Sequence, residues 1–318
     1  MKLEKKICRC CGGANFKRCK YRIVNDFFGY YAIHINPTIT VRGKFLKSIF
    51  GKKITNFLNK FLNFLFKSLF KIKNEIAYGA CLDCNFISVW PEFSDDQLID
   101  YYTCYLTSEY KLKRSQIDKG YPIIANNHGS LDELSIRRQQ NEDFIAPYLK
   151  EYKVIKNVKS LKMLDYGGGS GLVAPSFDFL NVDLLDVGDK SIKQLKKQIV
   201  ASSTEKIPKQ LKSYDFIQLL HVIEHVGHPL NVVRNSLQYL KKDGLIFIEV
   251  PWEMTNFDQL TVTSSITCDE HINKFCNLSL LQMMKFLKLK ILFCEGAYIK
   301  LLHSDAPIKV VRCLAKNC

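Results

Sequence analysis

The sequence has no long uncharged apolar run, and this lack excludes a membrane-spanning helix, which needs ~18 such residues in succession. The first residues, MKLEKKICRCCGG, contain no apolar core of a secretory signal, so we expect a cytoplasmic protein. In a reducing compartment the 12 cysteines are expected to be thiols or metal ligands, and not a disulfide framework.

Several familiar motifs are missing as well. The dinucleotide fingerprint G-x-G-x-x-G is absent after Gly167, because Leu172 stands where its third glycine would be. Neither an H-E-x-x-H metal motif nor an Asn/Asp-Pro-Pro-Tyr motif is present. These gaps argue against an NAD enzyme and against nucleic acid as the partner.

Residues 36–74 contain no acidic residue, but they contain nine Lys or Arg. Apolar residues, many of them phenylalanines, recur there at three- and four-residue steps, which predicts an inserted basic amphipathic helix of about 25 residues. Two interpretations stay open: residues 44–73 contact an anionic membrane at its inner face, or the helix packs on this chain or on a second copy. The net charge of +15 suits nucleic acid, an anionic membrane or an anionic substrate, and a lysine-rich solvated surface is the alternative.

Four cysteines form two C-x-x-C pairs: Cys8, Cys11, Cys81 and Cys84. Each tight turn presents two thiolates, and four thiolates complete a closed tetrahedral zinc site without a position for catalysis. We therefore predict a zinc-ribbon-like unit with structural zinc over residues 1–92, with Cys10 and Cys19 as spare thiols. The 69 residues between the pairs exceed the usual ~15–20, and reduced cysteines without metal are the alternative.

Residues 93–158 are predicted to form a helical bridge between this unit and a catalytic domain over residues 159–318. A Ser94 cap precedes clustered tyrosines, which form either a lid over a pocket or a packed aromatic helix. A polar helix over residues 135–157 then leads into the catalytic domain.

The chain is organised around residues 161–171, LKMLDYGGGSG. A short apolar strand ends at Asp165 and breaks into a turn with Gly167, Gly169 and Gly171, where a ligand can lie against bare peptide groups. Together with the missing dinucleotide fingerprint, the acid ahead of the first glycine indicates S-adenosylmethionine.

Beyond the glycines a short helix, disturbed by Pro175, is predicted to run to about residue 180. A second strand over residues 181–187 ends at Asp186, which is well placed to accept hydrogen bonds from a ribose diol. The alternative role for this acid is to cap a helix over residues 190–200.

Histidines follow the next apolar run, residues 214–220, which reads as a buried parallel strand. Ligands bind at the carboxyl ends of strands in open α/β sheets, so we expect chemistry at this position. We interpret His221, Glu224 and His225 as a group that supplies either a general base or a contact to the cofactor. His228 is expected to be structural.

The remaining elements are a helix over 230–240, a strand over 245–250, a helix over 278–287 and strands over 290–294 and 308–313. Because no helix separates the last two strands, they are expected to form an antiparallel hairpin at the sheet edge.

The order of these pieces resembles the class I S-adenosylmethionine-dependent methyltransferases over residues 159–313. The segments that carry the resemblance are DYGGGSG, LLDVGDKS, YDFIQLLHVIEHVGHP, LKKDGLIFIEVPWE and DEHINKFCNLSLLQMMKFL. The fold implied is α/β, a Rossmann-like, doubly wound, seven-stranded sheet. The cysteine pairs resemble the zinc-binding unit of sugar methyltransferases, including C-methyltransferases of nucleotide-linked keto-sugars.

The resemblance also implies roles for individual residues. By the family's pattern, Gly167, Gly169 and Gly171 would cradle the methionine end of the cofactor, and Asp186 would hold its ribose. Asp165 and His221, which stand at the ends of their strands, complete the predicted cofactor-binding set. The Glu270–His271 pair stands where the sugar C-methyltransferases supply a base, and His225 matches a second active-site histidine. Cys268 replaces their tyrosine, so transfer to a hydroxyl stays open.

The predicted function is therefore methyl transfer from S-adenosylmethionine to a sugar, nucleotide-sugar or glycan precursor, with a histidine as general base. The alternatives are methylation of RNA or of another small molecule, and a non-catalytic adaptor that keeps the fold.

Overall fold

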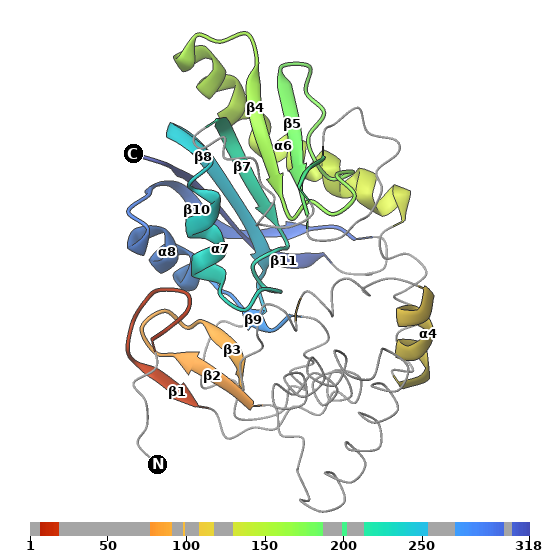
Figure 1. Cartoon of the computed structure of the whole chain (residues 1–318), viewed down its shortest axis with the longest axis vertical. Helices are drawn as coiled ribbons and strands as arrows, with labels where there is room; N and C mark the ends of the chain where they lie inside the picture. Colours follow the sequence, from red (N-terminus) through yellow and green to blue (C-terminus); the bar gives the residue numbers. More distant parts are fainter. Residues whose placement is uncertain are drawn as a thin grey trace, which may run out of the picture.

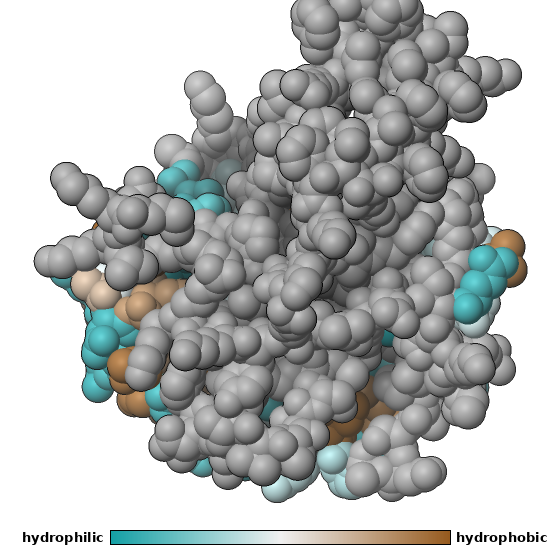
Figure 2. All heavy atoms as spheres, turned by 90° about the horizontal axis from the view of Figure 1, so that it is seen from below, coloured by the Kyte–Doolittle hydropathy of each residue, from teal (hydrophilic) through white to brown (hydrophobic). Residues whose placement is uncertain are grey.

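A computed structural model describes residues 7–18, 77–90, 98, 108–117, 130–186, 199–201, 213–253, 271–301 and 307–318. The predictions for the basic helix at 44–73, for the tyrosine-rich stretch at 99–107 and for Glu270 lie outside these residues. Within the described part, no helix is long and apolar enough to cross a membrane. On the face seen from below, described polar and apolar side chains lie next to one another (Figure 2).

The larger sheet contains seven strands in the spatial order β10-β11-β8-β7-β4-β5-β6. Their bounds are β4 (Leu161–Tyr166), β5 (Leu180–Leu185), β6 (Ile199–Ala201), β7 (Tyr214–Leu220), β8 (Leu240–Pro251), β10 (Lys290–Ile299) and β11 (Ile308–Lys316). Neighbours from β8 to β6 pair in parallel, whereas β11 is antiparallel to β8 and to β10. The predicted closing hairpin at the sheet edge is confirmed.

Helices cover both faces of this sheet (Figure 1). Their bounds are α6 (Leu131–Lys156), α7 (Pro229–Ser236) and α8 (Asn277–Phe286). Successive strand residues point to opposite faces, so Met163 packs in the cluster that contains Leu149 of α6. Its neighbour Leu164 packs in the other cluster, with Val233 of α7 and Met283 of α8. The parallel strands are therefore buried on both sides, as their continuous apolar runs predict.

The long helix α6 begins four residues before the predicted start. The side chain of Ser130 accepts a hydrogen bond from the backbone N–H of Glu133 (3.2 Å), which caps the first turn. Asn157 ends the helix in the left-handed conformation. Besides α6, the predicted bridge contains the helix α4 (Ser108–Ile117).

A smaller sheet has the strand order β1-β2-β3-β9 (Figure 1). Three of its strands come from the N-terminal part of the chain: β1 (Phe16–Arg18), β2 (Ala77–Cys81) and β3 (Ile87–Trp90). The fourth, β9 (Asn273–Lys274), comes from the catalytic part. The two cysteine pairs also pack in the same core cluster as α7 and α8.

The helix predicted between Gly171 and residue 180 is wrong. Residues 171–179 form turns, and β5 begins at Leu180. Pro175 has no N–H to donate to a helix, while Ser176 donates both its backbone N–H and its hydroxyl to Glu142 of α6.

Two further boundaries need correction. Ile199 and Val200, predicted at the end of a helix, lie in β6 and pair with β5. The helix expected over 230–240 ends at Ser236, whose hydroxyl donates to the Val233 carbonyl (2.8 Å). Strand β8 starts at Leu240, because this segment pairs with Tyr214 of β7.

Candidate active site and metal centre

The glycine turn follows β4 at the carboxyl edge of the parallel sheet. Gly167 (φ 75°) and Gly169 (φ 56°) have left-handed backbone conformations, which residues other than glycine rarely adopt. A Cβ on Gly167 would lie 2.7 Å from Cγ2 of Val222, whereas no described atom lies within 4 Å of a Cβ built on Gly169. The turn therefore packs closely on the segment after β7, and among the described residues its tip at Gly169 has free space beside it.

The carboxylate of Asp186, directly after β5, lies against this turn. Its Oδ2 accepts a hydrogen bond from the backbone N–H of Gly169 (2.7 Å). Because β4 and β5 pair in parallel, their carboxyl ends adjoin and bring the predicted cofactor residues Gly167, Gly169, Gly171 and Asp186 together. Bare peptide groups and a carboxylate fit the amino-acid end and the ribose of S-adenosylmethionine.

Asp165 lies beneath the turn and is only 2% exposed. Its Oδ2 abuts the position that a Cβ on Gly168 would take, and Gln218 donates to its Oδ1 (2.8 Å). Asn141 of α6 donates in turn to Gln218 (3.0 Å). Sequence reasoning missed Gln218 and Asn141, although a lone polar residue inside the apolar strand YDFIQLL is itself a signal.

His221 follows β7 and lies between two glutamates. Its Nε2 is 3.1 Å from Oε1 of Glu249, and its Nδ1 is 3.3 Å from Oε1 of Glu224. The other oxygen of Glu249 accepts from Arg312 of β11 (2.6 Å). The predicted cofactor residue His221 is thus part of a buried chain of charged groups that fixes the loop after β7.

Ion pairing decides the protonation states of Glu224, His221 and Glu249. Burial disfavours the ionised form of Glu224, but His225 and His221 outweigh it and lower its pKa to about 2. Burial and Arg137 likewise oppose protonation of His221, yet Glu224 and Glu249 raise its pKa above the ordinary value. The ionised form of both carboxylates is therefore favoured, and together they stabilise the protonated form of the histidine between them.

His271 and His225 face each other across the site, with ring centroids 4.9 Å apart at an angle of 67°. Nδ1 of His271 is 2.8 Å from Oε1 of Glu253, and Lys274 lies 3.4 Å from the second oxygen of Glu253. Burial lowers the pKa of His271, but Glu253 more than compensates and raises it overall. Glu253, just beyond β8, was missed by sequence reasoning, although an acid after a buried strand is a recognisable signal.

The same cluster could also hold a cation. Ligand atoms of Glu224, His225 and His271 lie within 4.8 Å of one another. Glu224 is completely buried; its Oε1 lies 3.3 Å from Nδ1 of His221, and its Oε2 has no hydrogen bond within the described residues.

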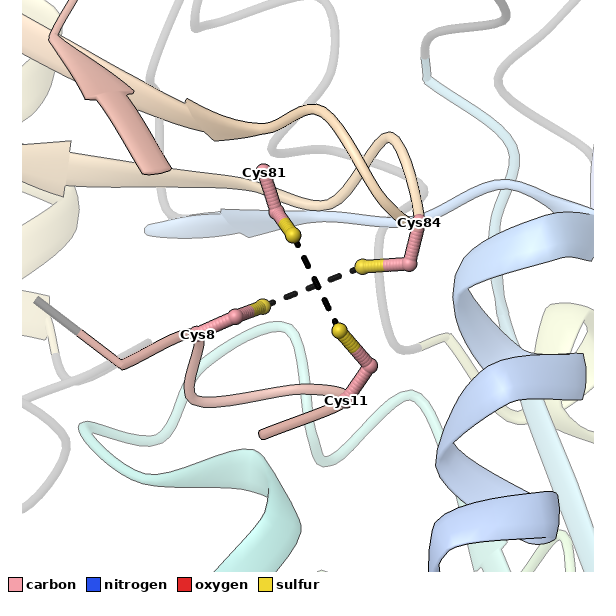
Figure 3. Close-up of side chains that lie close together, drawn as sticks. All are labelled: Cys8, Cys11, Cys81 and Cys84. Atoms are coloured by element: carbon pink, nitrogen blue, oxygen red, sulfur yellow. Dashed lines mark hydrogen bonds between the residues drawn. The ribbon is translucent and has the colours of Figure 1, made fainter. Parts of the chain in front are cut away.

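The four predicted zinc ligands converge on one point (Figure 3). The sulfur atoms of Cys8 and Cys84 are 3.8 Å apart, and those of Cys11 and Cys81 are 3.7 Å apart. Sulfurs bound tetrahedrally to zinc at about 2.3 Å lie about 3.8 Å from each other, whereas a disulfide bond measures about 2.0 Å. The residues present therefore fit structural zinc.

Cys10, a predicted spare ligand, lies beside the cluster, where its thiol interacts with that of Cys84, but it is not one of the four converging ligands. Its thiol donates to the Ser279 carbonyl of α8 (3.2 Å). Burial raises its pKa to about 11, so the thiol stays protonated. Backbone N–H groups of Cys10 and Gly13 instead lie 3.4 Å from the sulfurs of Cys8 and Cys11, as expected of a metal knuckle.

Together, the sheet, the glycine turn after β4 and the acid after β5 define a Rossmann-like protein with a nucleotide-cofactor site. Residues 134–292, half of the 318 residues, match the family described as Methyltransferase domain. The chain belongs to this family. This membership confirms the predicted enzyme class, an S-adenosylmethionine-dependent methyltransferase.

Known proteins of this kind are similar to parts of the chain. The ubiquinone biosynthesis O-methyltransferase of Pelagibacter ubique (strain HTCC1062) is 29% identical over 114 residues, 31% of this chain. The chain spans 47% of that relative's length.

Among solved structures, a methyltransferase of Burkholderia thailandensis is 10% identical and has a TM-score of 0.47. It is the 1,6-didemethyltoxoflavin-N1-methyltransferase with bound 1,6-didemethyltoxoflavin and S-adenosylhomocysteine, and the match covers 77% of this chain and 97% of that one. An S-adenosylmethionine-dependent methyltransferase of Aquifex aeolicus is 16% identical, with coverages of 62% and 97% and a TM-score of 0.40.

Proposed function

We propose that the chain transfers a methyl group from S-adenosylmethionine to a hydroxyl group of a small acceptor, with His271 as the general base. The acceptor class that we favour is a sugar, nucleotide-sugar or glycan precursor. The observation that carries the proposal is the pair His271–Glu253 beside His225, at the same sheet edge as the glycine turn.

On the cofactor side, the bare turn from Gly167 to Gly171 receives the amino-acid end, and Asp186 receives the ribose. When bound, S-adenosylmethionine supplies an electrophilic methyl group. The buried amides of Gln218 and Asn141 keep Asp165 in place and thereby keep the turn in one conformation. Such pre-organisation leaves less entropy to lose on binding.

On the acceptor side, His271 accepts the hydroxyl proton through its Nε2, because Nδ1 faces Glu253. Glu253 orients the ring and stabilises the imidazolium that forms, while Lys274 keeps Glu253 ionised. The contact between Gly167 and Val222 supports a short path from the cofactor to the histidines. Holding the acceptor oxygen in line with the methyl group supplies much of the rate enhancement.

The relative from Pelagibacter ubique supports an O-methyltransferase by its name, whereas the sugar class rests on the cysteine pairs and the positive net charge. We extend the proposal to structural zinc on Cys8, Cys11, Cys81 and Cys84, to a location in the cytoplasm, and to contact of residues 44–73 with an anionic membrane. Glu270 directly precedes the proposed base in the sequence and is retained as a candidate catalytic residue.

The test is incubation of the purified chain with methyl-labelled S-adenosylmethionine and glycan or metabolite extracts, read by mass spectrometry. Label should appear on a hydroxyl-bearing product with wild type and be lost with His271→Gln. Label on an RNA would support the alternative substrate, and no binding of S-adenosylmethionine would support the adaptor.

A second candidate role for the cluster is cation-assisted activation of the acceptor, which the convergence of Glu224, His225 and His271 favours. Dialysis against buffer that lacks Mg²⁺ and Mn²⁺ but contains no chelator, so that the four-cysteine unit keeps its zinc, separates the two. A free histidine base keeps its activity without added metal, whereas a cation-dependent site loses it and regains it with Mg²⁺ or Mn²⁺.

A further inference from the structure

Strand β9 belongs to two parts of the molecule at once. It pairs with β3 of the small sheet through Ile87↔Lys274 and Ser88↔Asn273. The backbone N–H of Val89 also donates to the Ile272 carbonyl (2.9 Å). The residue directly before this segment is His271, so the small sheet holds one of the two facing histidines.

The side chain of Asn273 links this strand to the loop that carries the other histidine. Its Nδ2 donates to the carbonyls of Ile223 (3.0 Å) and Val226 (2.6 Å). Its backbone N–H donates to the Glu224 carbonyl (3.0 Å), and the residue is only 1% exposed. Three hydrogen bonds from one residue therefore surround His225.

The first cysteine knuckle holds the same loop from its far end. The Arg9 guanidinium donates to the Gly227 carbonyl (2.5 Å), and the Arg9 carbonyl accepts from the Leu230 N–H (3.1 Å). The second knuckle continues into β3, so the four cysteines connect both attachments. A shift of the cysteine unit would thus move the loop and β9 together.

We propose that Asn273 is a positioning residue through which the four-cysteine unit sets the distance between His225 and His271. This inference rests on the proposed function, in which those histidines serve the acceptor. A carboxamide suits the position, because its two N–H groups satisfy two carbonyls at once, which a hydroxyl or an aliphatic side chain cannot do.

The chain offers a matched control in Asn317. Its Nδ2 also donates to two backbone carbonyls, those of Leu240 (3.4 Å) and Lys241 (3.1 Å), at the start of β8 and away from the site. Asn273→Ala and Asn317→Ala therefore remove the same kind of interaction from two places. Asn273→Ser, which keeps a single short donor, gives a milder variant if the alanine variant does not fold.

The experiment uses the full chain with ¹³C-labelled histidine and compares ring chemical shifts, assigned with His225→Gln and His271→Gln. Asn273→Ala or Asn273→Ser should shift the signals of His225 and His271, and Asn317→Ala should leave them in place. The affinity for S-adenosylhomocysteine, measured by calorimetry, should change less than twofold in each variant. Removal of zinc should shift the same two signals.

With an acceptor in hand, kcat of the Asn273 variants should fall by up to about a hundredfold, with KM nearly unchanged. Superimposable histidine signals in wild type and the Asn273 variants would overturn the inference. Equal shifts in the Asn273 and Asn317 variants would overturn it too, because they would indicate a general loss of structure. Absence of S-adenosylhomocysteine binding would instead refute the proposed function, since the histidine signals are read without any ligand.

Discussion

The proposed site has a cofactor side and an acceptor side, which are built in different ways. The cofactor side consists of consecutive loops after the neighbouring parallel strands β4 and β5, and uncharged amides of Gln218 and Asn141 support it. The acceptor side joins segments that are far apart in the chain, and partly buried ion pairs and the four-cysteine unit support it. The comparison teaches that cofactor binding and acceptor chemistry can fail independently.

The largest effect is expected from His271→Gln, which removes the proposed base. Turnover should fall by about 10²–10⁴-fold, while the Kd for S-adenosylmethionine stays the same, because the cofactor side has its own supports. His228→Gln, at the exposed start of α7, is the control and should keep wild-type turnover. Loss of both S-adenosylmethionine binding and turnover in His271→Gln would contradict the independence of the two sides.

Asp186→Ala is the corresponding change on the cofactor side. Loss of a hydrogen-bonded carboxylate costs about 1.5–3 kcal/mol, so the Kd for S-adenosylmethionine should rise by about tenfold to a hundredfold. Asp178→Ala removes an exposed acid from the preceding turn and should leave the Kd unchanged. Equal affinities of the Asp186 variant and wild type would remove the ribose assignment.

Cys81→Ser tests the support of the acceptor side. Elemental analysis should find one zinc per wild-type chain and none in the variant, since a three-thiolate site binds zinc more weakly. Loss of several kcal/mol of metal-coupled stability should lower the Tm by about 5–10 °C. Cys10→Ser should retain its zinc, because that thiol donates to the Ser279 carbonyl. Zinc loss from Cys10→Ser would show that the ligand set is different.

The smallest effect is expected in the pH profile. A base must be neutral to accept a proton, so activity should rise with pH through the pKa of His271, which Glu253 raises above its ordinary value. Glu253→Gln should move this rise in activity, the acidic limb of the pH profile, to lower pH. The same raised pKa stabilises the folded chain at low pH, and this contribution is lost as pH rises through it. A limb that stays in place in Glu253→Gln would exclude His271 as the titrating base.

Most of the cofactor side could be predicted from the sequence, because its determinants are local. The glycines, Asp165 and Asp186 follow predicted strands directly, and parallel pairing brings them together. The closing hairpin followed from the missing helix between two apolar runs. The wrong helix after Gly171 shows the limit, since Ser176 satisfies its donors on Glu142 of α6 and not on its own segment.

The acceptor side was only partly predictable, because its partners are set by tertiary structure. Sequence reasoning named His225 and His271 as candidates, but not Glu253 as the partner of His271. Nor could it foresee that Asn273 and Lys274 would complete a sheet whose other strands lie in the first 90 residues. The cysteine pairs were recognisable by spacing alone, yet their contact with the histidine loop depends on Arg9.

Calorimetric titration of S-adenosylhomocysteine into wild type, His271→Gln and Asp186→Ala, side by side, tests most directly whether the two sides are separate. We predict one binding site per chain in wild type, the same affinity in His271→Gln and a weaker affinity in Asp186→Ala. No binding to wild type, or a loss of affinity in His271→Gln but not in Asp186→Ala, would contradict this account.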